Sequence, residues 1–216
     1  MAVTGLFLLV FVVGHLAGNL QIFLGSEWLN AYAEHLLELP FILWPARVLL
    51  LAALVIHMVI SIRLSVENRR ARPVAYASKA TVQASLASRT MLISGFMIFF
   101  FVLFHLFHFT FGKVHPEYFN LYDAKGRHDV YSMVIWGFSS PWIAVSYLLA
   151  MFFLMAHLSH GASSFLQTLG LVKEQSLPLV KKIGLIFSIL IFVGYTSIPL
   201  ACCFGWLKPL QGVKAL

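Results

Sequence analysis

Residues 4–20 read TGLFLLVFVVGHLAGNL, and this stretch decides the fold. Apart from Thr4, the residues before His15 are all apolar or glycine. Extended to residues 3–25, the run is long enough for a helix to cross the hydrocarbon core of a membrane, which takes about 20 residues. Because an ionisable side chain is costly in hydrocarbon, the stretch predicts a transmembrane helix whose histidine has a function.

Four further stretches have a similar composition, so that candidate spans cover residues 3–25, 41–63, 90–112, 139–163 and 181–206. Of the 216 residues, 60% are hydrophobic and 11% charged, whereas soluble domains have about 45–50% and 25%. The first span lacks a basic start and a clean cleavage region, so we expect it to be retained and not removed as a signal peptide. The sequence predicts an all-α membrane protein, one domain over residues 1–216 with five transmembrane helices.

The formal net charge is +7, but the basic residues lie in loops and at span ends, which argues against a nucleic-acid partner. Most of them fall in two regions, residues 63–89 and 173–182. Basic loops mark the cytoplasmic side. We therefore expect a multi-pass protein of the bacterial cytoplasmic membrane, with its N-terminus inside and its C-terminus outside, and an amphipathic stretch at 76–88 on the inner membrane surface.

Four histidines, one in each of the first four spans, fall into two pairs of equal depth. With a helical rise of about 1.5 Å per residue, His15 and His105 lie roughly 21 and 24 Å above the inner face. By the same measure His57 and His157 lie roughly 9 and 6 Å above it. We expect the first two to face each other near the outer side and the other two near the inner side.

Two facing imidazoles at one depth are what a haem iron needs for its two axial positions. Zinc and copper are disfavoured, because neither thiolates nor carboxylates accompany the histidines. No C-x-x-C-H motif is present for covalent attachment. The sequence predicts two non-covalent b haems in a bundle of four helices, with iron ligands His15 and His105 for the outer haem and His57 and His157 for the inner one.

Five neighbouring residues are candidates for cofactor contacts. The small ones would leave clearance for a flat porphyrin, and the histidines would serve as hydrogen-bond donors or propionate partners. The alternative explanations are close helix approach for the small residues and interfacial polar residues without a cofactor role for the two histidines. The five are Gly18, Ser61, His108, His160 and Gly161.

At these residues the sequence resembles the diheme cytochrome b anchor of bacterial succinate dehydrogenases and fumarate reductases, in its five-helix single-subunit form. The resemblance covers essentially the whole chain. It rests on T-G-L-F-L-x-x-F-x-x-G-H at 4–15, H-L-A-G-N-L at 15–20, L-V-I-H at 54–57, Gly95 ten residues before His105, and H-x-x-x-G-x-x-x-F at 157–165.

The resemblance implies the same ligand pairing and a place in the tricarboxylic acid cycle or in fumarate reduction. It further implies a flavoprotein subunit and an iron–sulfur subunit on the cytoplasmic face, with menaquinone as the membrane substrate. The chain would be the electron-transfer and quinone-reactive part of a succinate:quinone oxidoreductase, without dicarboxylate chemistry of its own. Met155 stands where some members carry a glutamate used in proton transfer, so no intramembrane carboxylate route is expected.

Quinone reduction consumes protons as well as electrons, so proton-exchanging side chains are needed near a haem edge. The candidates on the predicted outer side are Glu34, His35, Glu38, His128, Asp129 and Tyr131. Two other functions stay open. A diheme anchor of a hydrogenase or formate dehydrogenase would share the cofactors and the quinone and differ in its partners, and a transporter would use the histidines as an ion or proton pathway.

Overall fold

The computed structural model describes residues 1–71 and 85–210, whose regular structure is helical apart from one isolated bridge between Tyr122 and His128. The long elements are α1 (Ala2–Asn19) continued by η1 (Leu20–Leu24), α3 (Pro40–Arg70), α5 (Met91–His105) continued by the π-helical turn η2 (Leu106–Thr110), α8 (Pro141–Thr168) and α9 (Leu177–Cys203). The short ones are α2 (Ser26–Leu37), α4 (Leu86–Arg89), α6 (Pro116–Phe119), α7 (Val130–Gly137) and η3 (Glu174–Ser176).

Five of these helical segments are long and apolar enough to cross a membrane, which confirms the predicted all-α class and the five candidate spans. Apolar side chains point outward from them: Phe41 is 93% exposed and Trp142 83%. Such a surface is stable in lipid, where a helix satisfies its own backbone hydrogen bonds. The chain is therefore a transmembrane helical protein.

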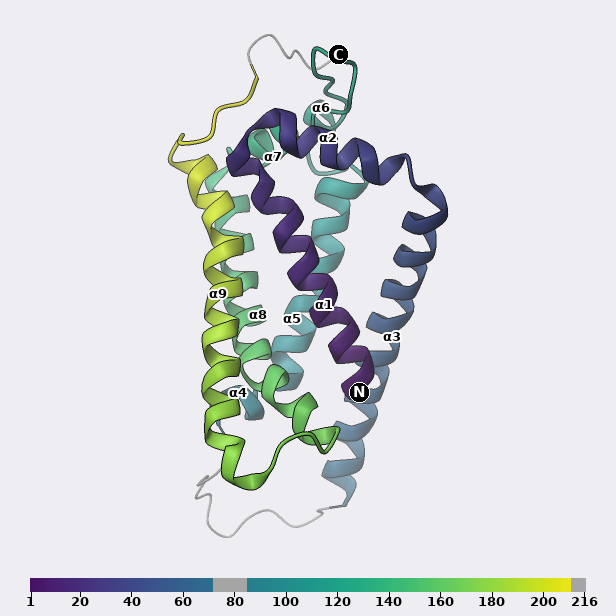
Figure 1. The fold of residues 1–216 in the computed structure, drawn as a ribbon, viewed down its shortest axis with the longest axis vertical. Helices are drawn as coiled ribbons and strands as arrows, with labels where there is room; N and C mark the ends of the chain where they lie inside the picture. Colours follow the sequence, from purple (N-terminus) through teal and green to yellow (C-terminus); the bar gives the residue numbers. More distant parts are fainter. Residues whose placement is uncertain (72–84, 211–216) are drawn as a thin grey trace.

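The long helices run side by side between two ends of the molecule (Figure 1). We call one the capped end, because α2, α6 and α7 lie there. We call the other the basic end, because it carries the N-terminus and basic residues such as Arg69, Arg70, Lys181 and Lys182. Within the bundle, α8 packs against α9, α5 and α1, and α1 packs against α3.

The larger buried cluster lies at the capped end. It includes Tyr131, Val134 and Ile135 of α7, packed with Tyr147 of α8 and Ile198 of α9. A second cluster joins α1, α8 and α9 through Leu16, Leu158 and Ile191. The short helix α7 therefore fills the space between the long helices and holds them together at that end.

Two helices continue beyond the predicted membrane spans, which were bounded at charged residues. The second span was expected to end at residue 63, but α3 continues to Arg70. Arg63 Nε lies 2.7 Å from Glu67 Oε1, and an ion pair of this spacing supports a helix outside the membrane. Likewise α9 begins at Leu177, before the lysines. The amphipathic stretch predicted at 76–88 lies mostly outside the described residues.

Candidate functional site

The four predicted histidines come from four different long helices and form two pairs. The ring centroids of His15 (α1) and His105 (α5) are 5.8 Å apart, and we call these the capped-end pair. Those of His57 (α3) and His157 (α8) are 6.5 Å apart, and we call these the basic-end pair. The partners expected from depth are therefore neighbours in the fold, and their role as iron ligands stays a prediction.

The spacing of the rings suits a shared metal ion. A bond between a metal and an imidazole nitrogen is about 2.0 Å long, so an ion held between two imidazoles sets their centroids about 6 Å apart. Both pairs are close to this value. No group of three or more His, Cys, Asp or Glu side chains within residues 1–71 and 85–210 is placed to hold a metal. An ion at either pair would therefore need the rest of its ligands from outside these side chains.

At the basic-end pair, a hydroxyl from a neighbouring helix lies at the Nδ1 atom of each ring. Thr4 Oγ1 is 3.2 Å from His57 Nδ1, and Ser94 Oγ is 3.1 Å from His157 Nδ1. Each hydroxyl already donates to the carbonyl oxygen three residues earlier in its own helix, at 2.9 and 3.1 Å. Each must therefore accept from the ring, which places the hydrogen on Nδ1 and leaves Nε2 free to bind a metal.

The capped-end pair is held differently. The Tyr147 hydroxyl lies 3.3 Å from His105 Nδ1. His15 Nδ1 lies 3.3 Å from Asn19 Nδ2, which also donates to the His15 carbonyl oxygen at 2.7 Å. Since an amide nitrogen is a donor, His15 is the one ring of the four whose Nδ1 meets a donor and not an acceptor.

Aromatic side chains surround the capped-end pair. One of them, Phe11, is stacked on His15 with ring centroids 5.2 Å apart. The neighbouring rings, all within 6.3 Å of one of the two histidines, are Phe11, Phe101, Phe109, Tyr147 and Tyr195. The capped-end site is therefore the more hydrophobic and the more crowded of the two.

The Nε2 atoms share one property at both sites. In the described part of the chain, no hydrogen-bond partner is found for Nε2 of His15, His57, His105 or His157, whose contacts all run through Nδ1. A metal-binding histidine typically presents one ring nitrogen to the metal while the other is held by the protein. His57 and His157 have this arrangement, and His105 has it when Tyr147 accepts from its Nδ1, whereas at His15 the Asn19 amide places a donor at Nδ1.

Sequence reasoning missed Thr4 and Ser94 as partners of the histidines, although a signal was present. Both α1 and α5 contain the pattern [ST]-G-x9-H, as Thr4-Gly5 with His15 and as Ser94-Gly95 with His105. Eleven residues of α-helix advance about 16 Å and return to nearly the same face. Each of these helices therefore supplies a ligand candidate to one site and a hydroxyl to the other.

The glycine of each pattern lies against one ring of the basic-end pair. A Cβ atom on Gly5 would be 3.2 Å from His57 Cε1, and one on Gly95 would be 3.6 Å from His157 Cε1. A larger residue at position 5 would press on the imidazole. The glycines therefore allow the two helices to approach the basic-end pair closely.

The other predicted cofactor contacts have varied surroundings. Gly18 packs against the Tyr32 ring, and a Cβ atom there would lie 2.7 Å from the Tyr32 hydroxyl. Gly161 has open space beside it, with nothing within 4 Å of a Cβ atom. Ser61 Oγ donates to the His57 carbonyl oxygen at 2.6 Å. Only Gly161 has the clearance expected for a porphyrin neighbour.

The two additional histidines differ in burial. His108 is buried, and its Nδ1 lies 2.9 Å from the Tyr147 hydroxyl, so the same phenol reaches both His105 and His108. His160 is half-buried near the basic end of α8. Its side chain makes no hydrogen bond to another described residue, and its carbonyl accepts from Ser163 Oγ at 3.1 Å.

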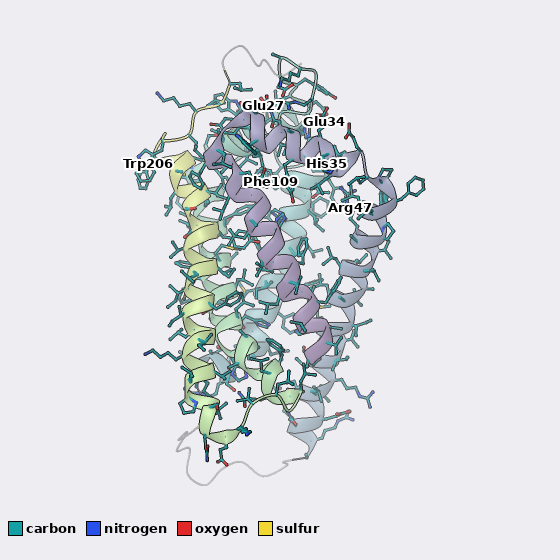
Figure 2. The ribbon with its side chains drawn as sticks, viewed as in Figure 1. Glu27, Glu34, His35, Arg47, Phe109 and Trp206 are labelled. Atoms are coloured by element: carbon teal, nitrogen blue, oxygen red, sulfur yellow. The ribbon has the colours of Figure 1, made fainter. Side chains whose placement is uncertain are left out.

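The six quinone-site candidates lie in two separate settings. Glu34 and His35 are exposed on α2 and Glu38 is exposed directly after it, and Figure 2 shows Glu34 and His35 at the capped end. Asp129 is fully buried, where its Oδ1 accepts from Ser132 N and from Asn30 Nδ2, both at 3.0 Å, and so caps α7.

The two remaining candidates are also built into the cap. His128 Nε2 donates to the Phe119 carbonyl oxygen at 2.6 Å. Tyr131 is buried, and its N–H donates to Asn30 Oδ1 at 2.9 Å. Burial raises the pKa of the Tyr131 phenol, which keeps it protonated. The structure gives His128, Asp129 and Tyr131 a scaffolding position and does not bring all six candidates together.

An ionic cluster fastens the loop before α7 to α2. Glu27 pairs with Lys125 at 2.7 Å and with Arg127 at 2.9 Å. Hydrogen bonds from Arg127 and Lys125 lower the pKa of the Glu27 carboxyl. Burial opposes the ionisation of Asp123, but hydrogen bonds, chiefly from Arg127, outweigh it and lower the Asp123 pKa. Both carboxylates therefore stay charged at neutral pH and hold the cap in place.

A hollow of about 170 Å³ adjoins the capped-end pair. It is lined by His15, Gly18, Asn19, Leu29, Tyr32, Ala33, Leu36 and Val130. A second hollow, of about 230 Å³ and apolar throughout, lies between α1, α8 and α9. Of these two hollows, only the first places polar side chains beside one of the histidine pairs.

Neither a protein-family model, nor a curated protein, nor a solved structure matches this chain.

Proposed function

We propose that the chain is the membrane-anchor cytochrome b subunit of a bacterial succinate dehydrogenase or fumarate reductase. It would carry electrons through two b haems between an iron–sulfur subunit and menaquinone. The observation that supports this best is the presence of two histidine pairs on four helices, with ring centroids 5.8 and 6.5 Å apart and every Nδ1 atom in contact with a side-chain partner.

Haem suits these pairs better than a bare metal ion. Structural zinc takes four protein ligands and catalytic zinc three, whereas the described residues offer groups of two. A haem with two axial histidines has no open position for a substrate, and its chemistry is one-electron transfer. His57 and His157 would hold one group and His15 and His105 the other, with Thr4 and Ser94 setting the tautomers at the basic end.

The two ends would then have different partners. The basic end would face the cytoplasm, because basic residues mark that side, and would receive the flavoprotein and iron–sulfur subunits that the sequence resemblance implies. Menaquinone would react at the capped end, in the hollow beside His15, where the side chains of Asn19 and Tyr32 offer hydrogen bonds to a quinone oxygen. A proton path through intramembrane carboxylates is not part of this proposal.

The first test is the cofactor content of the purified chain. A pyridine haemochrome assay should give two protohaems per polypeptide. A purified, folded protein with one haem or none would contradict the proposal, and a haem-free protein would favour the histidine-lined transporter.

The second test is copurification from the native membrane, with identification of the associated subunits. A flavoprotein and an iron–sulfur protein with succinate or fumarate activity are expected. If hydrogenase or formate dehydrogenase subunits copurify in their place, the proposed haems and quinone would stand and the assignment to succinate dehydrogenase or fumarate reductase would be wrong.

A further inference from the structure

Tyr147 makes a contact that the electron-carrying role does not by itself require. Its hydroxyl is 3.3 Å from Nδ1 of His105 and 2.9 Å from Nδ1 of His108. Both Tyr147 and His108 are buried, at 6% and 3% exposure. One phenol therefore joins a ligand candidate to a second histidine in the interior of the bundle.

A phenol has one hydrogen, so it can donate to only one of these two nitrogens and must accept from the other. The shorter contact is to His108. If His108 Nδ1 takes the Tyr147 hydrogen, the phenol oxygen accepts from His105 Nδ1, and the lone pair of His105 is then on Nε2. If the hydrogen goes to His105, the Nε2 atom of His105 carries a hydrogen and cannot bind a metal.

The buried position of His108 is energetically unfavourable. Its Nε2 atom is buried and has no hydrogen-bond partner in the described residues. Such groups are rare in folded proteins and call for a reason. The Nε2 atom lies close to Gly137 of α7, where a Cβ atom would be 3.0 Å away, and the Phe109 ring stacks on His108 with centroids 3.8 Å apart.

The backbone is also irregular at this point. His108 lies in η2, a π-helical turn that begins directly after His105. Single π-helical turns within α-helices are frequent at functional sites. The wider turn places His108 on the side of α5 that faces Tyr147 of α8.

We propose that Tyr147 and His108 are positioning residues for the capped-end haem ligand: His108 takes the Tyr147 hydrogen, so that Tyr147 accepts from His105 and keeps its Nε2 atom free for iron. This inference rests on the proposed function. A hydrogen bond from the far nitrogen makes an imidazole a stronger donor to its metal, and it therefore favours the oxidised haem. The pair would set the potential of the capped-end haem.

The decisive experiment is a redox titration of the purified complex carrying Tyr147→Phe. One of the two midpoint potentials should rise, with a change of about tenfold in the ratio of reduced to oxidised haem at a fixed potential, or about 59 mV for one electron. The midpoint potential of the other haem should stay unchanged. Loss of one haem from this variant would be the stronger form of the same effect.

Tyr195→Phe is the matched control. The Tyr195 ring is 6.3 Å from His15, but its hydroxyl donates to the Val12 carbonyl oxygen at 2.7 Å and meets no histidine nitrogen. This variant should retain both haems and both potentials. Equal shifts in the two tyrosine variants would overturn the inference, since they would reflect a general change of the site.

His108→Phe supplies a second measurement, because phenylalanine suits the surrounding aromatic cluster. It should shift the same potential as Tyr147→Phe, in the same direction and by less. If both variants retain two haems with unchanged potentials, the positioning role is wrong while the proposed function stands. A wild-type protein without haem would instead refute the proposed function.

Discussion

The two histidine pairs use the same residue type and are supported in different ways. At the basic-end pair, both Nδ1 atoms meet hydroxyls that can only accept, and each ring lies against a glycine. At the capped-end pair, one ring meets an amide donor, the other shares a phenol with His108, and aromatic rings surround both.

The difference indicates at which pair the histidine tautomers are fixed by immediate neighbours and at which pair they depend on more distant residues. The tautomers of His57 and His157 follow from two hydroxyls anchored in their own helices. Those of His15 and His105 depend on an amide and on a longer polar chain. That chain approaches the surface, because His108 lies 5.8 Å from His115 between centroids, and His115 Nδ1 is 3.1 Å from Glu117 Oε1.

The largest expected effect is the loss of one haem on removal of a ligand. His157→Ala should lower the cofactor content from two protohaems per chain to one, and His105→Ala should do the same at the other site. Since changes to groups that merely orient such ligands cost about 10- to 100-fold, succinate-to-quinone turnover should fall by more than this. Soluble-dye reduction by the assembled catalytic subunits should largely survive. Retention of both haems in His157→Ala would transfer the ligand assignment, with His160 as the next candidate.

Glycine-to-alanine substitutions should differ in their effect according to the space that the added Cβ atom would have. Gly5→Ala places a Cβ atom 3.2 Å from His57 Cε1, and overpacking of this kind costs about 1–3 kcal/mol, so the basic-end haem should dissociate more readily. Gly95→Ala, whose Cβ atom would lie 3.6 Å from His157 Cε1 at ordinary contact distance, is the control and should retain the haem better. Retention can be followed spectroscopically during mild detergent challenge. Equal behaviour of the two variants would show that Gly5 does not limit the space around His57.

Removal of one hydroxyl should have a moderate effect that is confined to one pair. Ser94→Ala takes the acceptor from His157 Nδ1 and should weaken haem binding at the basic end by about 10- to 100-fold. The capped-end haem should be affected much less. Ser146→Ala is a suitable control, because Ser146 Oγ bonds only to the Ile143 carbonyl oxygen in the described structure. A competition assay with a haem-binding apoprotein measures the difference, and an unchanged affinity would argue that the tautomer of His157 is set elsewhere.

The smallest expected effect is a pH dependence of the cap. The pKa values of Glu27 and Asp123 are lowered in the fold, so their contribution is complete above their ordinary values of 4.5 and 3.8. It is lost as the pH falls through the lowered values. Hydrogen-exchange protection in residues 113–129, taken relative to the intrinsic exchange rate at each pH, should therefore fall in acid. Asp123→Asn should bring faster exchange to neutral pH, whereas Glu34→Gln, at an exposed position, should not.

The sequence predicted those parts of the structure that depend on depth alone. Counting residues from the span ends was enough to pair His15 with His105 and His57 with His157, because helical rise is uniform. It could not give Tyr147 as the partner of His105, since the two lie far apart in sequence and meet only through helix rotation and tilt. The hydroxyls of Thr4 and Ser94 were missed although the repeated pattern carried a signal for them.

The cap was harder to predict for a related reason. His128, Asp129 and Tyr131 were expected to be proton exchangers from their residue types and their position in a loop. Their actual contacts are with Phe119 and Asn30, and these depend on how α2 lies across the end of the bundle. The π-helical turn after His105 likewise follows from packing against α7 and α8, and the apolar pattern of the span carries no sign of it.

The [ST]-G-x9-H pattern has a consequence for assembly. Because α1 and α5 each contribute to both sites, binding of a cofactor at one pair fixes the rotation and height of the same two helices at the other. The conformational entropy of these helices is then lost when the first cofactor binds and is not lost again when the second binds. Under the proposed function, loading of one site would therefore favour loading of the other in the wild-type chain, and half-loaded wild-type chains should be scarce during biogenesis.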